Sequence, residues 1–398
     1  MLNAKCFGRS ALDVRPLAFD VRRLALCHNE AVDPLAWMNA RLSEFVRDLE
    51  ALVRLESPSR DLEGLGRAAG FLKEAFSPLG LLEERPLSTG PLLRFRRAGR
   101  GGRVLLLLHY DTVHPRGAFP FRLEGDLAIG PGVYDMKGSF VQLLYALRFL
   151  EEAGLSHPDL TALFTPDEEI GSPESRPFIE EEARRADWVL VLEPPTPEGD
   201  LKVARKGVGL YRLRALGRAA HQGVEPEKGV NAILELAHQT LRVAALEDRG
   251  RGTTLGPNRV QGGTATNVVA EEAVLEIDLR AWTLEEVQRV EAGLKALSPV
   301  LEGARLELTG GLNRPPMEPT PASLALFEKA RDLGRRLGLD LKPGRVGGGS
   351  DGNFTTPFAP TLDGLGLFGR DAHQKREAVH LGEVPRRVAL LALLLSEL

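Results

Sequence analysis

The spacing of apolar residues divides most of the chain into alternating strands and helices. Largely apolar runs at 104–108, 160–165 and 187–192 are typical of strands that are buried on both faces. Apolar stripes at helical spacing predict helices over 39–56, 61–77, 139–150, 322–337 and 384–398. Strands that alternate with helices in this way favour an α/β fold around a mostly parallel sheet.

The pattern changes near Arg205 and returns to its first form near residue 313. Between these points the order β-α-β-β-α-β predicts an inserted α+β domain with a ferredoxin-like arrangement. Its elements are strand 207–216, helix 229–245, strands near 258–262 and 273–281, helix 283–296 and strand 304–309. We therefore expect a catalytic domain formed by 38–205 and 313–398. The inserted domain at 206–312 would leave one sheet face free to pair with a second copy.

Residues 1–37 show neither a helical nor a strand period. We therefore expect either that Met38 is the functional start or that 1–37 form a loosely attached, poorly ordered extension. They contain no apolar segment followed by a cleavage site, which disfavours a secretory signal. Both cysteines, Cys6 and Cys27, lie there, which argues against a disulfide framework and against thiolate metal ligands. No apolar run reaches the length of a membrane span, and the net charge of -4 disfavours nucleic acid. We expect a cytoplasmic protein with neither a membrane nor a nucleic-acid partner.

Metal-binding residue types follow three of the strands that we expect to be buried. His109 and Asp111 end the first run, Glu168 and Glu169 follow the second, and Glu193 follows the third. The carboxyl ends of parallel strands meet at one edge of a sheet, where ligands bind in α/β proteins. Imidazole and carboxylate ligands suit zinc and other first-row divalent ions, so a hydrolytic centre with two ions is the leading interpretation. A strand-end histidine bonded to Asp111, and a solvated acidic turn at 166–172, are the simpler alternatives.

Two glycine-rich turns also carry polar candidates. Asp135 lies in GPGVYDMKG, directly before the predicted helix 139–150, where it could bridge two ions or simply cap that helix. The turn GGGSDGNF at 347–354 lacks the sequence pattern of a phosphate-binding loop, which disfavours nucleotide binding.

Five segments together resemble the signature blocks of a known enzyme family: LLLLHYD, GVYDMKG, PDEEIGS, VLEP and DAHQKREAV. They look like those of the zinc-dependent exopeptidase and deacylase family. That family includes the glutamate carboxypeptidases of the carboxypeptidase G type, succinyl-diaminopimelate desuccinylase, acetylornithine deacetylase and aminoacylase. The resemblance extends from about residue 39 to the end of the chain, with the blocks in the family's order and spacing.

The resemblance implies two zinc ions per subunit, with cobalt or manganese as alternatives. The implied metal ligands are His109, Asp135, Glu169, Glu193 and His373. Asp135 would bridge both ions, while Glu169 and Glu193 would each bind one of them. Asp111 would orient His109, and Glu168 would serve as the general base and later as the acid toward the leaving amine.

The choice of the last ligand rests on the pattern His-x-x-x-Glu-x-Val. HQKREAV matches this pattern of the family, so His373 is preferred to the nearby His380. The remaining histidines are expected to be structural or surface residues: His28, His114, His157 and His238.

The resemblance also covers residues expected to contact the substrate. GRAAHQG at 217–223 resembles a block whose histidine reaches the neighbouring subunit, so His221 would stabilise the oxyanion in the partner's site. Asn267 and Arg280 resemble contacts to a substrate carboxylate or oxyanion, with a turn residue and a surface ion pair as their alternatives. Further implied substrate contacts are Arg314, Gly349 and Ser350, with Asp351 beside them.

The implied activity is hydrolysis of an amide bond in a small peptide or an N-acyl amino acid. A carboxypeptidase G-like exopeptidase is the leading prediction, because Glu193 is glutamate as in the carboxypeptidase and desuccinylase branches. The alternatives are an N-acyl-amino-acid deacylase, such as acetylornithine deacetylase or succinyl-diaminopimelate desuccinylase, and a binding module without activity. Glu168 argues against the binding module, which needs no free base. The resemblance further implies that 206–312 is a dimerisation or lid domain and that the protein is a homodimer formed through it.

Overall fold

A computed structural model describes residues 32–398. Cys6, Cys27, His28 and most of the predicted N-terminal extension lie outside the described residues. The first helix is α1 (Pro34–Asn39), and its buried Trp37 packs edge-on against Phe149 with ring centroids 5.4 Å apart. Residues 34–37 therefore belong to the packed structure, four positions earlier than the predicted start at Met38. A six-residue helix is too short for its apolar face to show a period in the sequence.

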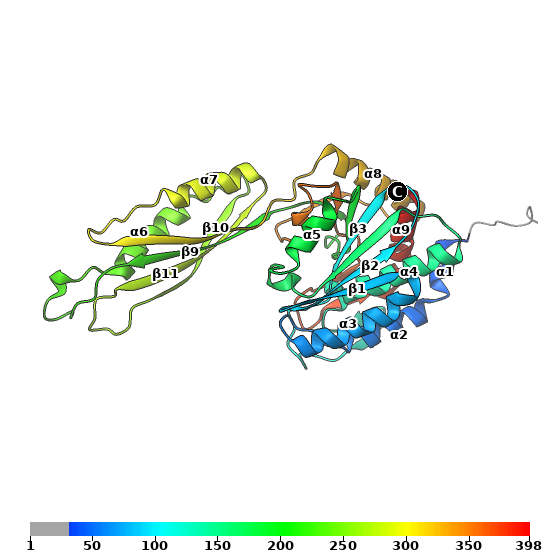
Figure 1. Cartoon of the computed structure of the whole chain (residues 1–398), viewed down its shortest axis with the longest axis horizontal. Coiled ribbons are helices and arrows are strands. Elements are labelled where there is room, and N and C mark those ends of the chain that lie inside the picture. Colours follow the sequence, from blue (N-terminus) through cyan, green and yellow to red (C-terminus); the bar gives the residue numbers. More distant parts are fainter. Residues whose placement is uncertain (1–31) are drawn as a thin grey trace, which may run out of the picture. The chain divides into compact units, whose positions relative to one another are not determined.

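The main sheet is built from β1 (Leu81–Leu87), β2 (Gly90–Arg97), β3 (Arg103–His109), β6 (Asp159–Thr165), β7 (Trp188–Val191) and β14 (Thr361–Leu362). Its strand order is β1-β2-β6-β3-β7-β14. Figure 1 labels β1, β2 and β3 of this sheet. The four strands from β6 to β14 are parallel, whereas β1 and β2 are joined antiparallel at one edge. The predicted α/β fold with a mostly parallel sheet is confirmed.

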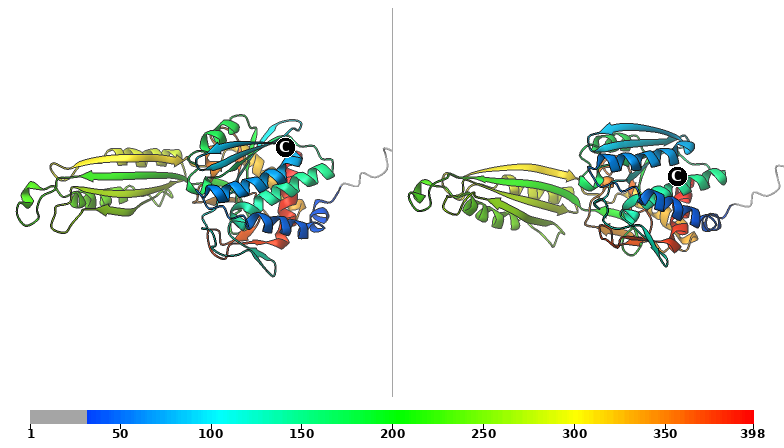
Figure 2. Two further views of the ribbon diagram at one scale, coloured as in Figure 1. Left: turned by 60° about the horizontal axis from the view of Figure 1, so that its bottom comes forward. Right: turned by 90° about the horizontal axis from the view of Figure 1, so that it is seen from below.

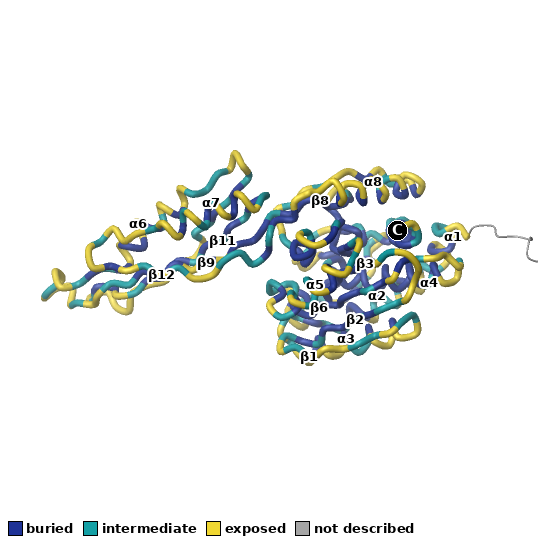
Figure 3. Tube along the Cα trace, turned by 45° about the horizontal axis from the view of Figure 1, so that its top comes forward, coloured by how far each residue is buried: buried dark blue, intermediate teal, exposed yellow. Residues whose placement is uncertain are grey.

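Helices cover both faces of this sheet, because its central strands are apolar on both sides. In β3, Leu106 and Leu108 join one hydrophobic core, while Leu105 and Leu107 join another. All four are buried, and the dark tube of β3 in Figure 3 shows this. Helices of the larger core are α2 (Leu42–Val53), α3 (Leu62–Phe76), α4 (Gly138–Glu152), α8 (Pro321–Arg336) and α9 (Val384–Glu397). The smaller core is completed by α5 (Arg176–Ala183) and the 3₁₀ turn η6 (Asp351–Phe354).

The inserted segment forms a second sheet with its own hydrophobic core. Its elements are β9 (Gly207–Leu216), α6 (Ala232–Ala244), β10 (Thr254–Gly262), β11 (Glu272–Ala281), α7 (Leu284–Lys295) and β12 (Arg305–Arg314). The strand order β10-β11-β9-β12 is antiparallel throughout and is that of a ferredoxin-like fold. Both helices lie on the same side of this sheet (Figure 2). The predicted α+β arrangement of the insert is therefore confirmed.

Several short elements were not predicted from the sequence. They include β8 (Leu201–Arg205) with β13 (Pro343–Val346), and a small sheet of β4 (Arg122–Glu124), β5 (Leu127–Ile129), β15 (Gly369–Arg370) and β16 (Ala378–His380). Strands of two to five residues are too short for an apolar period to be recognised. The predicted strand 361–368 ends at Leu362, because Gly364 adopts a left-handed backbone conformation with φ of 82°.

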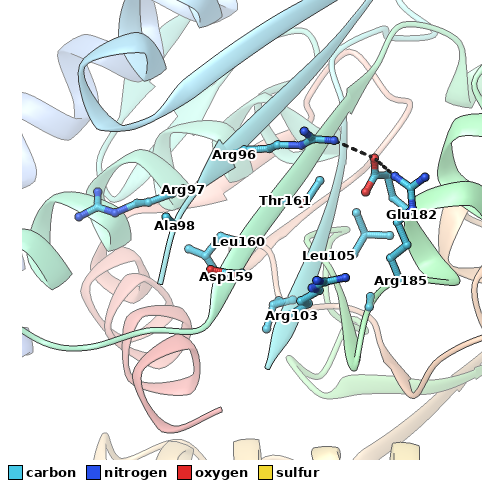
Figure 4. Close-up of a pocket in the computed structure, with 12 residues that line it drawn as sticks. Arg96, Arg97, Ala98, Arg103, Leu105, Asp159, Leu160, Thr161, Glu182 and Arg185 are labelled. Carbon is cyan, nitrogen blue, oxygen red and sulfur yellow. Dashed lines mark ion pairs between the residues drawn. The ribbon is translucent and has the colours of Figure 1, made fainter. Parts of the chain in front are cut away.

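A cavity of about 410 Å³ lies at the amino ends of β3 and β6, lined by none of the predicted site residues (Figure 4). Four arginines line it, and two of them, Arg96 and Arg185, face the carboxylate of Glu182 at 3.5 and 3.7 Å. A third, Arg97, pairs with Glu151 at 3.5 Å. We interpret this cavity as part of a surface ion-pair network. Within residues 32–398, no helix is both long and apolar enough to cross a membrane.

Candidate metal centre

The predicted ligands converge because three neighbouring strands end at the same edge of the main sheet. β3 pairs in parallel with β6 on one side and with β7 on the other, so their carboxyl ends lie side by side. His109 is the last residue of β3, and Glu193 follows shortly after β7. Glu168 and Glu169 form the 3₁₀ turn η4 (Glu168–Ile170) that follows β6. Sheet topology therefore brings together side chains that lie far apart in the sequence.

The carboxylate of Asp135 lies between two imidazoles. Its Oδ1 is 3.1 Å from Nε2 of His109, and its Oδ2 is 3.2 Å from Nε2 of His373. Each imidazole has a further carboxylate beside it: Glu193 is 3.5 Å from His109, and Glu169 is 3.3 Å from His373. Asp135 thus contacts both histidines, and each histidine also contacts a different glutamate.

Asp135 does not cap the following helix, which was its simpler interpretation. The residue at the start of α4 is Lys137, and no side chain caps that end. Asp135 instead lies in a short turn, η3 (Val133–Lys137), which points its carboxylate at His109 and His373.

The residues present fit a bound divalent cation. Ligand atoms of His109, Asp135 and Glu169 lie within 4.8 Å of one another, as do those of His109, Glu168 and Glu193. The buried Oε1 of Glu169 has no hydrogen-bond partner among the described residues. An unpaired buried carboxylate oxygen is costly unless a cation binds it. Imidazole nitrogen and carboxylate oxygen are the ligands that zinc and similar ions prefer.

The pKa values of this cluster also indicate that its negative charge favours the binding of protons or cations. Hydrogen bonds that the imidazole of His373 donates to the carboxylates of Asp135 and Glu169 raise the pKa of His373 to about 11. Burial lowers the pKa of His109, but its carboxylate neighbours outweigh burial and raise that pKa well above the ordinary value. Burial also raises the pKa of Glu169. Without a metal ion the cluster thus retains protons, which bound cations would replace.

Asp111 lies on the side of His109 away from Asp135 and holds the η4 turn through hydrogen bonds. Its carboxylate faces Nδ1 of His109 at 3.4 Å and accepts hydrogen bonds from the backbone N–H groups of Glu168 and Glu169, at 3.1 and 3.2 Å. The hydroxyl of Ser59 donates a further hydrogen bond of 2.8 Å. Asp111 is completely buried, so it orients His109 and the η4 turn and does not reach the cavity.

Glu168 lies near His109 and Glu193, but its ion pair is with an arginine. The guanidinium of Arg314 donates to Oε1 of Glu168 at 2.9 Å and to Asp351 at 2.9 Å. Burial raises the pKa of Glu168 well above its ordinary value, although Arg314 and His109 oppose this effect. Such a carboxylate accepts a proton more readily than an exposed one, as a general base requires.

A cavity of about 600 Å³ opens onto this cluster. The predicted residues that line it are Asp135, Glu168, Glu169, Glu193, His373 and Gly349. Three cationic residues that the sequence did not single out also line it, Lys202, Arg205 and Arg370. Burial and the neighbouring Arg205 lower the pKa of Lys202 to about 8, so its ammonium remains charged at neutral pH.

The other predicted substrate contacts have different surroundings. Arg314 is buried, with its guanidinium bonded to Glu168 and Asp351. Ser350 is fully buried, and its hydroxyl donates to Asp363 at 2.7 Å. Both residues support the wall of the site in this structure.

The predicted residues of the insert lie in and beside its sheet. The exposed loop residues His221 and Asn267 are close, because His221 forms a backbone bridge to Val268. Arg280 pairs with Asp278 on β11 at 2.8 Å, which is the surface ion pair considered as its alternative. In the described part of the chain, no hydrogen bond or ion pair joins these residues to the carboxylate cluster.

His380 lies outside the cluster. Its ring stacks on Phe368 with centroids 5.3 Å apart, and its Nδ1 is 3.8 Å from Asp126. Sequence reasoning missed the environment of Glu377, a buried carboxylate bonded to the turn that carries Asp135 and to His114. The one available signal was the Glu in the pattern His-x-x-x-Glu-x-Val.

Comparison with known proteins identifies the family. The pattern of peptidase family M20/M25/M40 matches residues 105–397. The chain belongs to this family. Carboxypeptidase G2 from Pseudomonas sp. (strain RS-16) is 33% identical over 372 residues, which cover 89% of this chain and 89% of that relative. Succinyl-diaminopimelate desuccinylase from Delftia acidovorans is 27% identical over 376 residues, which cover 86% of this chain and 95% of that relative.

Solved structures of this family share the fold. Aminopeptidase PepT from Bacillus cereus aligns with a TM-score of 0.72 at 21% identity, over 89% of this chain and 98% of that one. Membership in the M20 family confirms the resemblance inferred from the five sequence blocks. It also establishes that the protein is a hydrolase of a metallopeptidase and amidohydrolase family whose members use divalent metal ions.

The two candidate histidines can be separated by their effect on metal binding. We expect His373→Ala to weaken zinc binding by more than the about 10- to 100-fold that loss of an outer-shell partner costs. His380→Ala is the matched control and should bind zinc as the wild type does, because His380 contacts none of the candidate ligands. Competition against a chromophoric chelator measures both affinities. Loss of affinity in the His380 variant alone would move the ligand to His380.

Proposed function

We propose that this M20 enzyme is a two-zinc exopeptidase that cleaves the amide bond before a carboxylate-bearing amino acid. One observation carries the proposal: Asp135 presents one oxygen to His109 and the other to His373, while Glu168 remains outside both pairs. A bridging carboxylate between two sets of ligands, with a separate buried base, is the arrangement that hydrolysis at two metal ions requires.

In this proposal the ligands divide into two sets. His109, Asp135 and Glu193 would hold one ion, and His373, Asp135 and Glu169 would hold the other. Cobalt or manganese are alternatives to zinc, because the same ligand atoms suit them. When bound, such ions supply Lewis-acid activation of water and of the scissile carbonyl.

The protein's own residues then move the proton. Glu168 takes a proton from the attacking water, which its raised pKa favours, and later delivers it to the leaving nitrogen. Arg314 holds the Glu168 carboxylate in place through a hydrogen bond of 2.9 Å. Asp111 keeps His109 oriented, because it faces the ring nitrogen opposite to the one beside Asp135.

Lys202 supports a substrate with a free carboxylate. Its buried side chain lines the cavity, and its ammonium has no hydrogen bond or ion pair with the described residues. Its ammonium is accessible in the cavity, so an anionic group of the substrate would form a charge-assisted contact with it. Gly349 lines the same cavity without a side chain and allows the substrate backbone to approach. The similarity to carboxypeptidase G2 over 89% of the chain supports this choice.

An N-acyl-amino-acid deacylase remains the second candidate. The alignment with succinyl-diaminopimelate desuccinylase covers 95% of that relative. Hydrolysis of an N-acyl amino acid would need the same base and the same types of metal ligand. Small peptides and N-acyl amino acids are therefore the substrate classes to compare.

Dimerisation through 206–312 completes the proposal. The free face of the insert sheet carries ion pairs, such as Arg214 with Glu272 at 2.7 Å, and so does not favour the predicted face-to-face pairing. Apolar exposure lies instead on α6, where Leu234 and Leu241 are 50% and 74% exposed. The adjoining β10 is an edge strand with Val260 exposed. An apolar helix beside an open strand edge fits pairing with a second copy.

Replacing the proposed base tests the mechanism. We expect Glu168→Gln to bind zinc with nearly wild-type affinity but to lose about 10²- to 10⁴-fold in kcat, because general-base catalysis contributes that much. Turnover and bound metal are measured on the same samples. Glu174→Gln is a control, because Glu174 is a carboxylate in the same loop that contacts Ser88. Wild-type turnover in the Glu168 variant would remove it from the mechanism.

A substrate panel tests the specificity. The proposal expects folyl-glutamate or N-acyl-glutamate to have a higher kcat/KM than N-acetylornithine and succinyl-diaminopimelate. The C-terminal amide of the best substrate should be cleaved at least about tenfold less efficiently, because it loses a charge-assisted contact. A preference for N-acetylornithine or succinyl-diaminopimelate would favour the deacylase. The absence of hydrolysis across the panel with zinc bound would favour a binding module.

Mixed dimers test the role of His221 in the partner's site. Each of His221→Ala and Glu168→Ala should be nearly inactive alone. Their equimolar mixture should recover up to about a quarter of wild-type activity, because random pairing makes half the dimers mixed, each with one complete site. Adding Leu241→Glu to both chains should abolish the recovery by disrupting the exposed apolar stripe of α6. Inactive mixed dimers would place His221 outside the reaction.

A further inference from the structure

Glu377 is a buried carboxylate that none of the proposed steps uses. One of its oxygens, Oε1, accepts hydrogen bonds from the backbone N–H groups of Tyr134 and Asp135, at 2.8 and 2.9 Å. The other, Oε2, is 2.6 Å from Nε2 of His114 and accepts from the N–H of Gly132 at 3.3 Å. Both oxygens are therefore occupied. Two of the four partners belong to the turn that presents Asp135, and a third, Gly132, directly precedes it.

The segment that carries Glu377 also carries His373. After Glu377 the chain enters β16, which pairs with β5 so that Ala378 lies opposite Ile129. The carbonyl of Glu377 accepts from the N–H of Gly130 at 3.2 Å, directly before the turn. Two segments about 240 positions apart are thus joined at the point where each supplies a candidate ligand.

An ordinary buried ion pair with His114 would not explain this arrangement. Such a pair needs one contact, whereas Glu377 also accepts from the N–H groups of Gly132, Tyr134 and Asp135. Buried N–H groups outside regular structure need an acceptor, and without Glu377 these three would lose theirs. His114 stands on the far side of the carboxylate, where it fixes its orientation.

We propose that Glu377 is a positioning residue that joins the Asp135 turn to the His373 segment and so sets the metal affinity of the site. His373 depends on this connection most, because its side chain is 51% exposed and has few packing contacts to hold it. This inference rests on the proposed two-metal function. It adds a supporting residue to that site and assigns His114 a role that the sequence did not indicate.

The test compares two buried glutamates that each accept from backbone N–H groups. Glu377→Gln and Glu377→Ala are the test variants. Glu235→Gln and Glu235→Ala are matched controls, because Glu235 accepts from the N–H groups of Val300 and Leu301 at 3.0 and 2.7 Å, within the insert. Zinc affinity and stoichiometry are measured by chelator competition on the full-length protein. Thermal unfolding of the metal-free proteins reports stability separately.

We expect Glu377→Ala to weaken zinc binding by about 10- to 100-fold, as for loss of an outer-shell partner, with the ion that involves His373 affected most. Glu377→Gln should show a smaller loss, because an amide keeps one acceptor oxygen but turns its NH₂ toward a donor. The Glu235 variants should lower the melting temperature and leave zinc affinity unchanged. If Glu377→Ala does not fold, the Gln variant decides.

The outcomes separate this inference from the proposed function. Wild-type protein that binds two zinc ions, with Glu377 variants of equal affinity, would overturn the positioning role alone. Equal losses of zinc affinity in the Glu377 and Glu235 variants would also overturn it, since the effect would then follow general stability. Wild-type protein that binds no zinc would instead refute the two-metal proposal.

Discussion

The main constraint on the candidate metal centre is the electrostatic repulsion among four carboxylates that lie close to one histidine. Asp135, Glu168, Glu169 and Glu193 converge near His109 at the edge of the sheet. Like charges at this range oppose one another, and burial removes the water that would otherwise screen them. The folded state can hold these carboxylates together only if nearby positive charge compensates their negative charge. Protonated imidazoles supply part of that charge in the metal-free protein, and divalent cations would supply more.

The backbone fixes the cluster in two stages. Parallel pairing first aligns the strand ends, with His109 opposite Thr165 and Leu107 opposite Val191. Hydrogen bonds between loops then set the orientation of the side chains, through Asp111 on the η4 turn and Glu377 on the Asp135 turn. The first stage depends on apolar packing, and the second on buried carboxylates that accept from backbone N–H groups. The fold itself therefore sets the positions of the η4 turn and of Asp135.

The sequence revealed the first stage better than the second. His109 and Glu193 could be placed because apolar runs mark strands and parallel strands share an edge. His373 lies on an irregular segment with a positive φ of 65°, where no period exists, and only the family resemblance identified it. Contacts such as Arg314 with Glu168 join residues 146 positions apart, and side-chain spacing along a chain contains no information about them. The buried Lys202 was missed because a lysine on a short strand ordinarily reads as a surface residue.

The connections to the insert show why the site and the second domain depend on each other. Arg205 comes directly before the insert and pairs with Asp363 at 2.7 Å, with Glu193 at 3.7 Å. Arg314 ends β12, the last strand of the insert, and binds Glu168. The chain thus enters and leaves the insert at a buried arginine, and each arginine lies beside one carboxylate of the cluster: Glu193 or Glu168. Removing one partner of a buried ion pair leaves the other charge without compensation. A displacement of Arg205 or Arg314 would therefore change the electrostatic potential at Glu193 or Glu168. The two junctions between the catalytic domain and the insert therefore each place a positive charge beside a carboxylate of the cluster.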